Sequence, residues 1–310
     1  MTQVTQEGQL TLSPQQLKAM AEGKGWVGTY AWPAVRKFIV TKPLGAVGGV
    51  IVLAMIFVAV FAEGIAPYDP YEINQRLQFS PPSVHHWFGT DEFGRDLFSR
   101  IVYGARVAML IGLSAAFIGA TGGAILGVIS AYLGGKVDLF VQRGVDVMLA
   151  FPLLILALAI VTVLGRSIPN VVVAIAIPII PRTARIVRST ALSIKENMYV
   201  EAARAVGCSH LLVMARHIIP NVMAPYLIML TAQFGNAILV EASLSFLGLG
   251  TAEPTPSWGL MLSGSALSYA EKAAWVAVFP GIAISLAVFG FNLFGDSLRD
   301  ALDPKLRHRS

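Results

Sequence analysis

Few residues in this chain have types and spacing that could do chemistry. Two carboxylates, Asp146 and Glu241, stand near or within long apolar runs, where an ionisable side chain is costly and often functional. Such a carboxylate can line the path of a transported molecule. Asp146 also follows Arg143 by one helical turn, so the alternative is that these two side chains neutralise each other. Asp146 and Glu241 are therefore candidate pathway residues.

The other reactive side chains do not combine into a site. His85 and His86 stand near Asp91, but adjacent histidines in a loop rarely share a metal ion, and the simpler expectation is a solvated loop. The single cysteine, Cys208, excludes an internal disulfide and is expected to be a small packing residue. No Ser/His/Asp or paired-carboxylate arrangement supports hydrolysis. The sequence predicts no enzyme, no metal site and no cofactor bound by this chain.

The second apolar run contains a series of small residues and no nucleotide-binding motif. Gly122 and Gly127 have the spacing of a phosphate-binding loop, but Val128 and Ile129 stand where Lys and Ser or Thr are required. The small residues recur every four positions, at Ala115, Gly119, Gly123, Gly127, Ala131 and Gly135. This spacing lets helix backbones approach closely in lipid. It is typical of a tightly packed helix, or alternatively of one that moves or lines a substrate path.

Composition places these residues in a membrane. Of the 310 residues, 55% are hydrophobic and 13% are charged, and the mean hydropathy is +0.66. A soluble domain carries about 25% charged residues. The charge-free runs are 44–62, 107–135, 147–165, 167–181, 218–240 and 273–295. Because a membrane-crossing helix needs roughly 20 apolar residues, these runs predict an all-α, polytopic membrane protein with six spans.

The distribution of Lys and Arg predicts the orientation. With the N-terminus inside, the outer segments contain only Arg76, Arg95, Arg100, Arg106, Arg166 and Lys272. The rest of the 23 Lys and Arg residues lie in the inner segments and terminal tails, which is a positive-inside bias. Both termini are therefore expected in the cytoplasm. The net charge of +5 needs no nucleic acid to explain it, because the excess lies on the inner segments.

Prolines and charges mark the ends of several spans. In the outer segment 63–104, the pattern from 90 to 101 predicts an interfacial helix leading into the second span. Pro152 falls in the third span, and Pro178 and Pro181 in the fourth, where each can kink its helix. Beyond Pro181 the helix is expected to continue inward. Its basic ridge, Arg182, Arg185 and Arg188, fits lipid headgroups or a partner contact equally well.

The polar segment 193–221, which we call the bracket, lies between two apolar runs. Glu201-Ala202-Ala203 favours helix, and Gly207 is a plausible left-handed helix terminator. Ser209 can cap a second helix, and Pro220 then stops that helix or kinks it into the next span. The second helix carries an apolar stripe of Leu211, Leu212 and Ala215. The segment is therefore expected to form two short helices joined at a glycine beneath the membrane.

The bracket resembles the EAA signature of importer-type ABC permeases: Glu201-Ala202-Ala203, three residues, Gly207, and the closing Ile218-Ile219-Pro220. The resemblance implies a short coupling helix that inserts into a groove on a cytoplasmic ATPase. The ATPase-coupling residues that it implies are Glu201, Ala202, Ala203, Arg204, Gly207 and Pro220. For Glu201, capping of its own helix is the alternative.

The resemblance extends over about residues 36–307 and narrows to the C-type subunit of dipeptide and oligopeptide permeases. The matching stretches are 88–100, 133–138, 146–152, 244–250, 254–259, 291–296 and 298–304. It implies a multi-pass permease of the bacterial inner membrane that forms half of a translocation pathway. The implied partners are a B-type permease subunit, two cytoplasmic ATPases that bind the ATP, and an extracytoplasmic substrate-binding protein.

The expected organisation is a cytoplasmic tail over 1–43, a transmembrane domain over 44–295 and a second cytoplasmic tail over 296–310. The expected substrates are di- or oligopeptides, although similar permeases handle nickel, opines, glutathione, oligosaccharides or antimicrobial peptides. An ion-coupled secondary transporter is the main alternative class. It predicts inverted repeats with carboxylates at corresponding positions, and the sequence does not show these convincingly.

Overall fold

The computed structural model describes residues 3–4, 10–11, 36, 39–263, 269 and 271–302. Most of the expected tail over 1–43, and positions 303–310 of the expected C-terminal tail, lie outside the described residues. Residues 1–46 and 47–310 form two separate compact units. In the first unit, the short strands β1 (Gln3–Val4) and β2 (Leu10–Thr11) pair antiparallel.

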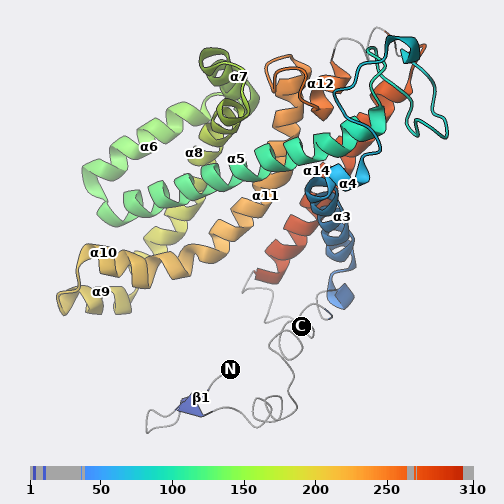
Figure 1. Cartoon of the computed structure of the whole chain (residues 1–310). Helices are drawn as coiled ribbons and strands as arrows, with labels where there is room; N and C mark the ends of the chain where they lie inside the picture. Colours follow the sequence, from blue (N-terminus) through green and yellow to red (C-terminus); the bar gives the residue numbers. More distant parts are fainter. Residues whose placement is uncertain are drawn as a thin grey trace. The chain divides into compact units, whose positions relative to one another are not determined.

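The second unit is built from helices, which confirms the predicted all-α fold (Figure 1). The long helices are α3 (Pro43–Val60), α5 (Leu97–Leu133), α6 (Gly135–Leu149), α7 (Leu153–Leu164), α8 (Ile168–Lys195), α11 (Ile219–Phe246) and α14 (Trp275–Leu302). The short elements are α4 (Ala62–Ile65), η2 (Gln75–Leu77), α9 (Met198–Ala205), α10 (His210–Val213), η3 (Met214–Ile218) and α12 (Trp258–Leu262). Among the described residues, five helical stretches are long and apolar enough to cross a membrane, and the bent pair α6 and α7 makes a sixth if it counts as one span.

Helix α5 starts earlier than the second apolar run predicted. It begins at Leu97, where the Asp96 carboxylate accepts a hydrogen bond of 2.8 Å from the backbone N–H of Ser99. The interfacial helix expected over 90–101 is therefore wrong in its first part: residues 90–96 form a loop, whereas residues 97–101 are helical and lead into the second span as the first turns of α5. With 37 residues, α5 is about 55 Å long and exceeds the hydrocarbon thickness of a bilayer.

The third apolar run does not form one straight helix. Helix α6 ends at Leu149, Pro152 stands just before the first residue of α7, and the two axes differ by 93°. Proline provides no N–H for the helix and disfavours helical geometry at the residue before it, which explains the break. The single span predicted over 147–165 is thus corrected to a broken one. In α8, by contrast, Pro178 and Pro181 lie inside a helix that continues to Lys195, as predicted.

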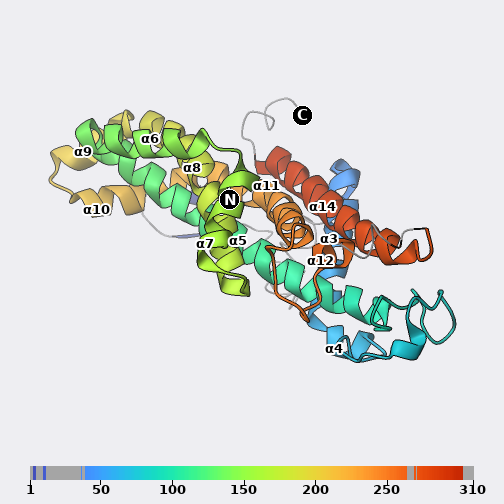
Figure 2. The same ribbon diagram turned by 90° about the horizontal axis from the view of Figure 1, so that it is seen from above.

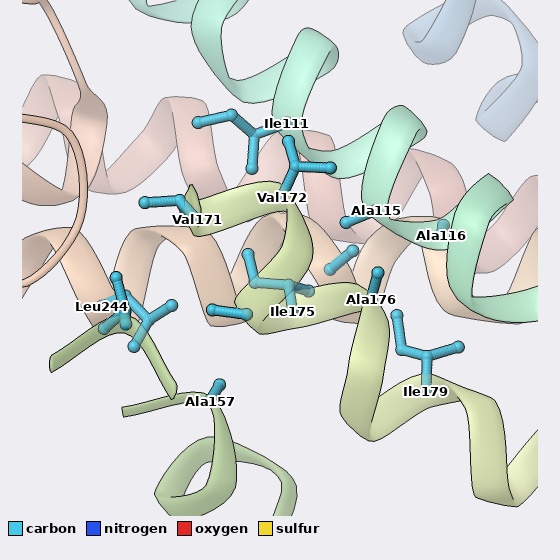
Figure 3. Close-up of a cluster of buried hydrophobic side chains, with 13 residues drawn as sticks. Ile111, Ala115, Ala116, Ala157, Val171, Val172, Ile175, Ala176, Ile179 and Leu244 are labelled. Carbon is cyan, nitrogen blue, oxygen red and sulfur yellow. The ribbon is translucent and has the colours of Figure 1, made fainter. Parts of the chain in front are cut away.

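The contact between α5 and α8 lies at the centre of the packing and uses the small residues of α5. A Cβ atom added to Gly119, Gly123 or Gly127 would lie within 2.5–2.6 Å of a backbone carbonyl oxygen of α8. The side chains of Ala115 and Ala131 are fully buried. Figure 3 shows the adjoining cluster, in which Ala115 and Ala116 of α5 face the α8 side chains. Over residues 115–131, the small residues of α5 therefore pack tightly against α8, as the first of the two interpretations predicted.

A second group of helices packs on the other part of α5. Trp258 of α12 is buried and donates from its indole N–H to the Ile101 carbonyl at 2.9 Å. Helices α3 and α14 lie side by side (Figure 2), and a Cβ on Gly48 would clash with the α14 backbone. Helix α3 has no polar side chain, and only 22% of its span is buried, so its other face suits lipid.

Replacing Gly123 with Ala should destabilise the helix pair, because the new methyl group would lie 2.5 Å from the Ile180 carbonyl oxygen. Overpacking of this kind costs about 1–3 kcal/mol. Gly122→Ala is the matched control, since its Cβ would lie 3.6 Å from its nearest neighbours and both changes gain the same helix propensity. Thermal unfolding of the purified protein in detergent should show a lower midpoint for Gly123→Ala. Equal midpoints would contradict the close approach of the two backbones.

Candidate functional site

The bracket has the predicted helix–glycine–helix form. Helix α9 ends at Ala205, and Gly207 follows with a φ of +82°, a conformation that L side chains rarely adopt. The N–H of Gly207 bonds to the Arg204 carbonyl at 3.0 Å, and the N–H of Cys208 bonds to the Ala203 carbonyl at 3.1 Å. These two bonds make a Schellman motif, which satisfies the last carbonyls of α9. Gly207 is thus required by the backbone.

The second half of the bracket runs without interruption into the next span. The Ser209 hydroxyl accepts a hydrogen bond of 3.4 Å from the Leu212 N–H, as the predicted cap of α10. One π-helical turn, η3, then leads into α11, where Pro220 occupies the first turn. Proline is tolerated there because the first N–H groups of a helix have no intrahelical partner. Pro220 therefore does not end the helix. It lies in the first turn of α11 and not next to Gly207.

The inner face of the bracket is anchored in a hydrophobic cluster. Val200 and Ala203 of α9, with Val213 and Ile218 beyond Gly207, are buried. They pack with side chains near the end of α5 and along α8. Fully burying a Val or Ile side chain contributes about 1.5–3 kcal/mol, so this contact holds both short helices against the two long ones.

The outer face of the bracket is apolar and uncovered. Met198 is 84% exposed, Val206 79% and Leu211 76%, and Ala202 lies exposed between them along the segment. Among the described residues, no hydrogen bond or ion pair involves the Glu201 carboxylate at this face, so it does not cap its own helix. Exposed apolar patches with a polar rim mark interaction sites. The arrangement can therefore bind another protein.

Tyr132, near the end of α5, joins the bracket to the long helices. Its hydroxyl group lies 2.9 Å from Nδ1 of His210 in α10, and its ring lies under the guanidinium of Arg204 in α9, 4.8 Å from the ring centroid. The side chain itself is buried. The Tyr132 carbonyl accepts a bond of 2.8 Å from Nζ of Lys195, the last residue of α8. Tyr132 thus contacts three of the elements that surround it, and we call this group the Tyr132 clasp.

Arg204 occupies a different place from the other predicted coupling residues. Glu201 and Ala202 lie exposed on the outer face, whereas Arg204 turns inward to Tyr132. Its Nε atom is buried and has no hydrogen-bond partner among the described residues. Cation–π contact contributes about 0.5–2 kcal/mol, more where water is excluded. The geometry makes Arg204 a positioning residue inside the bracket.

A charged network lies beside the clasp. Arg188 of α8 donates twice to the Asp138 carboxylate of α6, at 2.6 and 2.5 Å, and Ser130 of α5 donates to the same carboxylate at 2.5 Å. Bidentate Arg–carboxylate pairs are among the stronger ionic contacts. This network fastens α6 to the α5–α8 pair. Arg188 therefore binds a residue of its own chain, whereas the sequence had predicted contact with lipid headgroups or with a partner protein.

The two predicted pathway carboxylates lie apart. Asp146 of α6 forms an ion pair with Arg185 of α8, not with Arg143, and both side chains are about half exposed. Glu241 of α11 is only 1% exposed and accepts hydrogen bonds from Ser245 at 2.8 Å and Ser257 at 3.0 Å. Glu241 therefore faces packed protein in this structure. The pathway role of both residues stays a prediction.

Sequence reasoning missed the Tyr132 clasp. The hydroxyl contact joins residues 78 positions apart, and the Asp138–Arg188 pair joins residues 50 apart. A tyrosine at the end of a run of small residues was the only local signal. It does not say which loop the tyrosine contacts.

Among the described residues, several helices apolar enough to cross a membrane are joined to a polar segment whose outer face is exposed and apolar. The family described as binding-protein-dependent transport system inner membrane component matches residues 123–308. The N-terminal transmembrane domain of oligopeptide transport permease C matches residues 32–82.

Curated relatives match nearly the whole chain. A dipeptide transport system permease of Alkalihalophilus pseudofirmus is 44% identical over 89% of this chain and 90% of its own. A glutathione transport system permease of Escherichia coli is 45% identical over 83% and 84%. A solved amino acid ABC transporter, 20% identical, matches 66% of this chain and 94% of its own with a TM-score of 0.45. The chain belongs to the family of binding-protein-dependent inner membrane transport components and is a C-type ABC permease subunit, not an enzyme.

Tyr132→Phe removes the hydroxyl contact with His210 but keeps the ring under Arg204. One hydrogen bond contributes about 1 kcal/mol, which is roughly a fivefold change in a local opening equilibrium. Amide hydrogen exchange over 198–213 should therefore rise about fivefold, and further for Tyr132→Leu. Tyr226→Phe is the control, because it removes a hydroxyl contact of 2.9 Å with Thr121 and leaves the clasp intact. Unchanged exchange in Tyr132→Leu would contradict the clasp.

Proposed function

We propose that this chain is a permease subunit of an ATP-driven importer of short peptides and forms half of its translocation pathway. The observation that carries the proposal is the bracket, whose uncovered apolar face is fixed to the long helices by a buried inner face. The names of the matched relatives support the same function. An exposed surface that is rigidly attached to membrane helices suits a protein whose helices are moved by a partner outside the membrane.

The complex that we infer contains this chain, a B-type permease subunit, two cytoplasmic ATPases and an extracytoplasmic substrate-binding protein. The ATP is bound by the ATPases. Glu201 and Ala202, exposed on the outer face of the bracket, contact a groove on one ATPase, and Gly207 sets the angle between the two short helices. Both chain termini lie in the cytoplasm with the bracket, in line with the positive-inside distribution of Lys and Arg.

The mechanism follows from how the bracket is held. When ATP closes the ATPase pair, the docked α9 moves with it. Arg204 and His210 transmit that movement through Tyr132 to the end of α5. Because α5 and α8 are in backbone contact, they move together as one body and reorient the pathway. Rigid elements with two discrete arrangements are the physical requirement for such coupling.

Short peptides are the substrate class that the relatives favour. One relative is named for dipeptides and another for glutathione, which is itself a tripeptide. Both substrates combine amide groups with charged ends. No observation favours nickel, opines or oligosaccharides for this chain.

Affinity co-purification of the tagged protein from its native membrane, with ATPase activity assayed on the eluate, tests the proposal. We expect a second permease and two ATPases in the eluate, and ATP hydrolysis that rises with peptide-loaded binding protein. Recovery of a lone protein that transports by itself would overturn the proposal in favour of a secondary carrier.

Glu201→Lys should leave membrane insertion intact and reduce peptide-stimulated ATP hydrolysis of the purified complex at least about tenfold, since charge reversal at a protein interface costs over about 1.4 kcal/mol. Glu72→Lys is the matched control, because Glu72 is exposed in the segment between α4 and α5. That segment lies at the other end of α5 from α9 and α10 (Figure 1). Gly207→Pro should have the same effect, since proline cannot adopt the φ of +82°. Wild-type transport with both changes would defeat the docking proposal.

A further inference from the structure

Helix α6 carries an apolar stripe that nothing else in the described part of the chain covers. Val137, Phe140 and Val147 are 43%, 72% and 64% exposed, and their spacing places them on one face of the helix. Phe151, just beyond the end of α6, is exposed as well. Exposed apolar side chains that adjoin one another mark a contact with another protein or with lipid. The stripe therefore needs an occupant.

Two cationic residues flank the stripe along one side. Lys136 and Arg143 are both exposed, and they stand seven residues, or about two helical turns, apart. Within residues 39–263 and 271–302, neither side chain has a hydrogen bond or an ion pair. An amphipathic helix with aromatic and aliphatic residues on one face and Lys or Arg beside them is typical of a helix that lies in the plane of a membrane surface. The side chains of α6 thus favour lipid as the occupant.

The bend between α6 and α7 indicates how α6 is oriented (Figure 1). The residues of α7 are apolar except Thr162, whose hydroxyl donates to the Leu158 carbonyl at 2.7 Å, so α7 suits the hydrocarbon. The loop 165–167 leads into α8, and a loop this short makes consecutive helices antiparallel neighbours. Because the axes of α6 and α7 differ by 93°, α6 lies across the direction in which α7 runs into the bilayer.

Two ion pairs determine the level at which α6 crosses α8. Asp138 and Asp146 are about 12 Å apart along α6, whereas their partners Arg188 and Arg185 are only about 4.5 Å apart along α8. A long stretch of α6 is thus held at one level of α8. That level is near the end of α8 that leads into the bracket, which is the cytoplasmic end in the proposed orientation. The level is therefore that of the lipid headgroups.

The two flanking cations argue against a second permease as the occupant. If α6 crossed the membrane against a partner helix, Lys136 and Arg143 would lie about 10 Å apart in depth, and an unpaired cation within the hydrocarbon is costly. In a helix that lies flat, both side chains reach the headgroups at the same depth. The phosphate groups there provide the negative charge that this chain does not place beside them.

We propose that α6 lies flat in the inner surface of the membrane, with its apolar stripe among the acyl chains and with Lys136 and Arg143 bound to the phosphates of anionic phospholipids. The inference rests on the orientation given under the proposed function. Because α6 is paired with α8 and follows α5 directly after the Tyr132 clasp, the lipid surface supports the inner ends of the two helices that anchor the bracket. The chain then enters the bilayer only with α7.

Depth measurements with a nitroxide label, on the assembled importer in phospholipid vesicles, test the placement. Labels on Val137→Cys, Phe140→Cys and Val147→Cys should all lie about 5–10 Å below the phosphates, because a flat helix keeps its apolar face at one depth. If α6 crossed the membrane, the depths of positions 137 and 147 would differ by about 15 Å. The parent complex, whose permease chain has the single Cys208, gives the background signal.

Leu139→Cys is the matched control for Phe140→Cys. Leu139 is also apolar and 54% exposed, but successive residues of a helix point about 100° apart. On a flat helix, a water-soluble nickel chelate should therefore reach the label at position 139, whereas oxygen dissolved in the lipid should reach the label at position 140. On a helix that crosses the membrane, both labels would have the same surroundings.

Two results would overturn the inference. A graded depth from 137 to 147 would show that α6 crosses the membrane, and low accessibility of position 140 to both reagents would show that the second permease covers the stripe. In either case peptide transport by the parent complex would leave the proposed function standing. Absence of peptide transport by the parent complex would overturn the proposed function itself, whatever the depths are.

The phosphate contact has a separate readout. Photoactivatable phosphatidylglycerol, mixed into phosphatidylcholine vesicles, should label residues 135–151 of the assembled importer. Lys136→Gln with Arg143→Gln should reduce that labelling about fivefold or more, and leave labelling by photoactivatable phosphatidylcholine unchanged. Arg76→Gln with Lys272→Gln is the control, because it removes two exposed cations outside α6. Unchanged phosphatidylglycerol labelling in the Lys136 and Arg143 variant would overturn the contact.

Discussion

The close approach of α5 and α8 is the constraint on which the rest of the structure depends. In lipid there is no hydrophobic gain from pressing two apolar helices together, so their association needs dense backbone contact. The glycines at 119, 123 and 127 provide it, because they place no side chain of their own between the two backbones. Around this pair, α7 and α11 add aliphatic side chains (Figure 3). The α6 helix is fastened by an ionic contact instead.

The bracket obtains its rigidity from that pair and not from its own length. Helices of eight and four residues are too short to be stable in isolation. Their buried side chains and the Tyr132 clasp supply what the backbone lacks. A segment held in this way can transmit a force, whereas a free loop would absorb it. The cost is the buried Nε atom of Arg204, which has no hydrogen-bond partner among the described residues.

Sequence reasoning succeeded where one stretch of chain determines the outcome. Within the described residues, the structure confirms predictions that rest on local properties: five of the six spans, the packing of the small residues, the positive φ of Gly207 and the cap at Ser209. It failed where distant segments compete for a partner. Asp146 pairs with Arg185 of α8 and not with Arg143 of its own helix, and the sequence of one helix does not say which residue of another helix lies beside it. At Pro152 the sequence predicted only a kink within one span, whereas the two helices meet there at 93°, because hydropathy carries no information on backbone direction.

The length of α5 has one more consequence. Being 37 residues long and gripped over its glycines by α8, it has the mechanics of a rod held in its interior. A rod that tilts about such a grip moves its two ends in opposite directions. The end at Asp96 lies about 40 Å from Gly123 and the end at Tyr132 about 14 Å, so the Asp96 end would shift roughly three times as far without any bend between them. An event at one surface of the membrane would be felt at the other in a single step, with no relay of intermediate contacts.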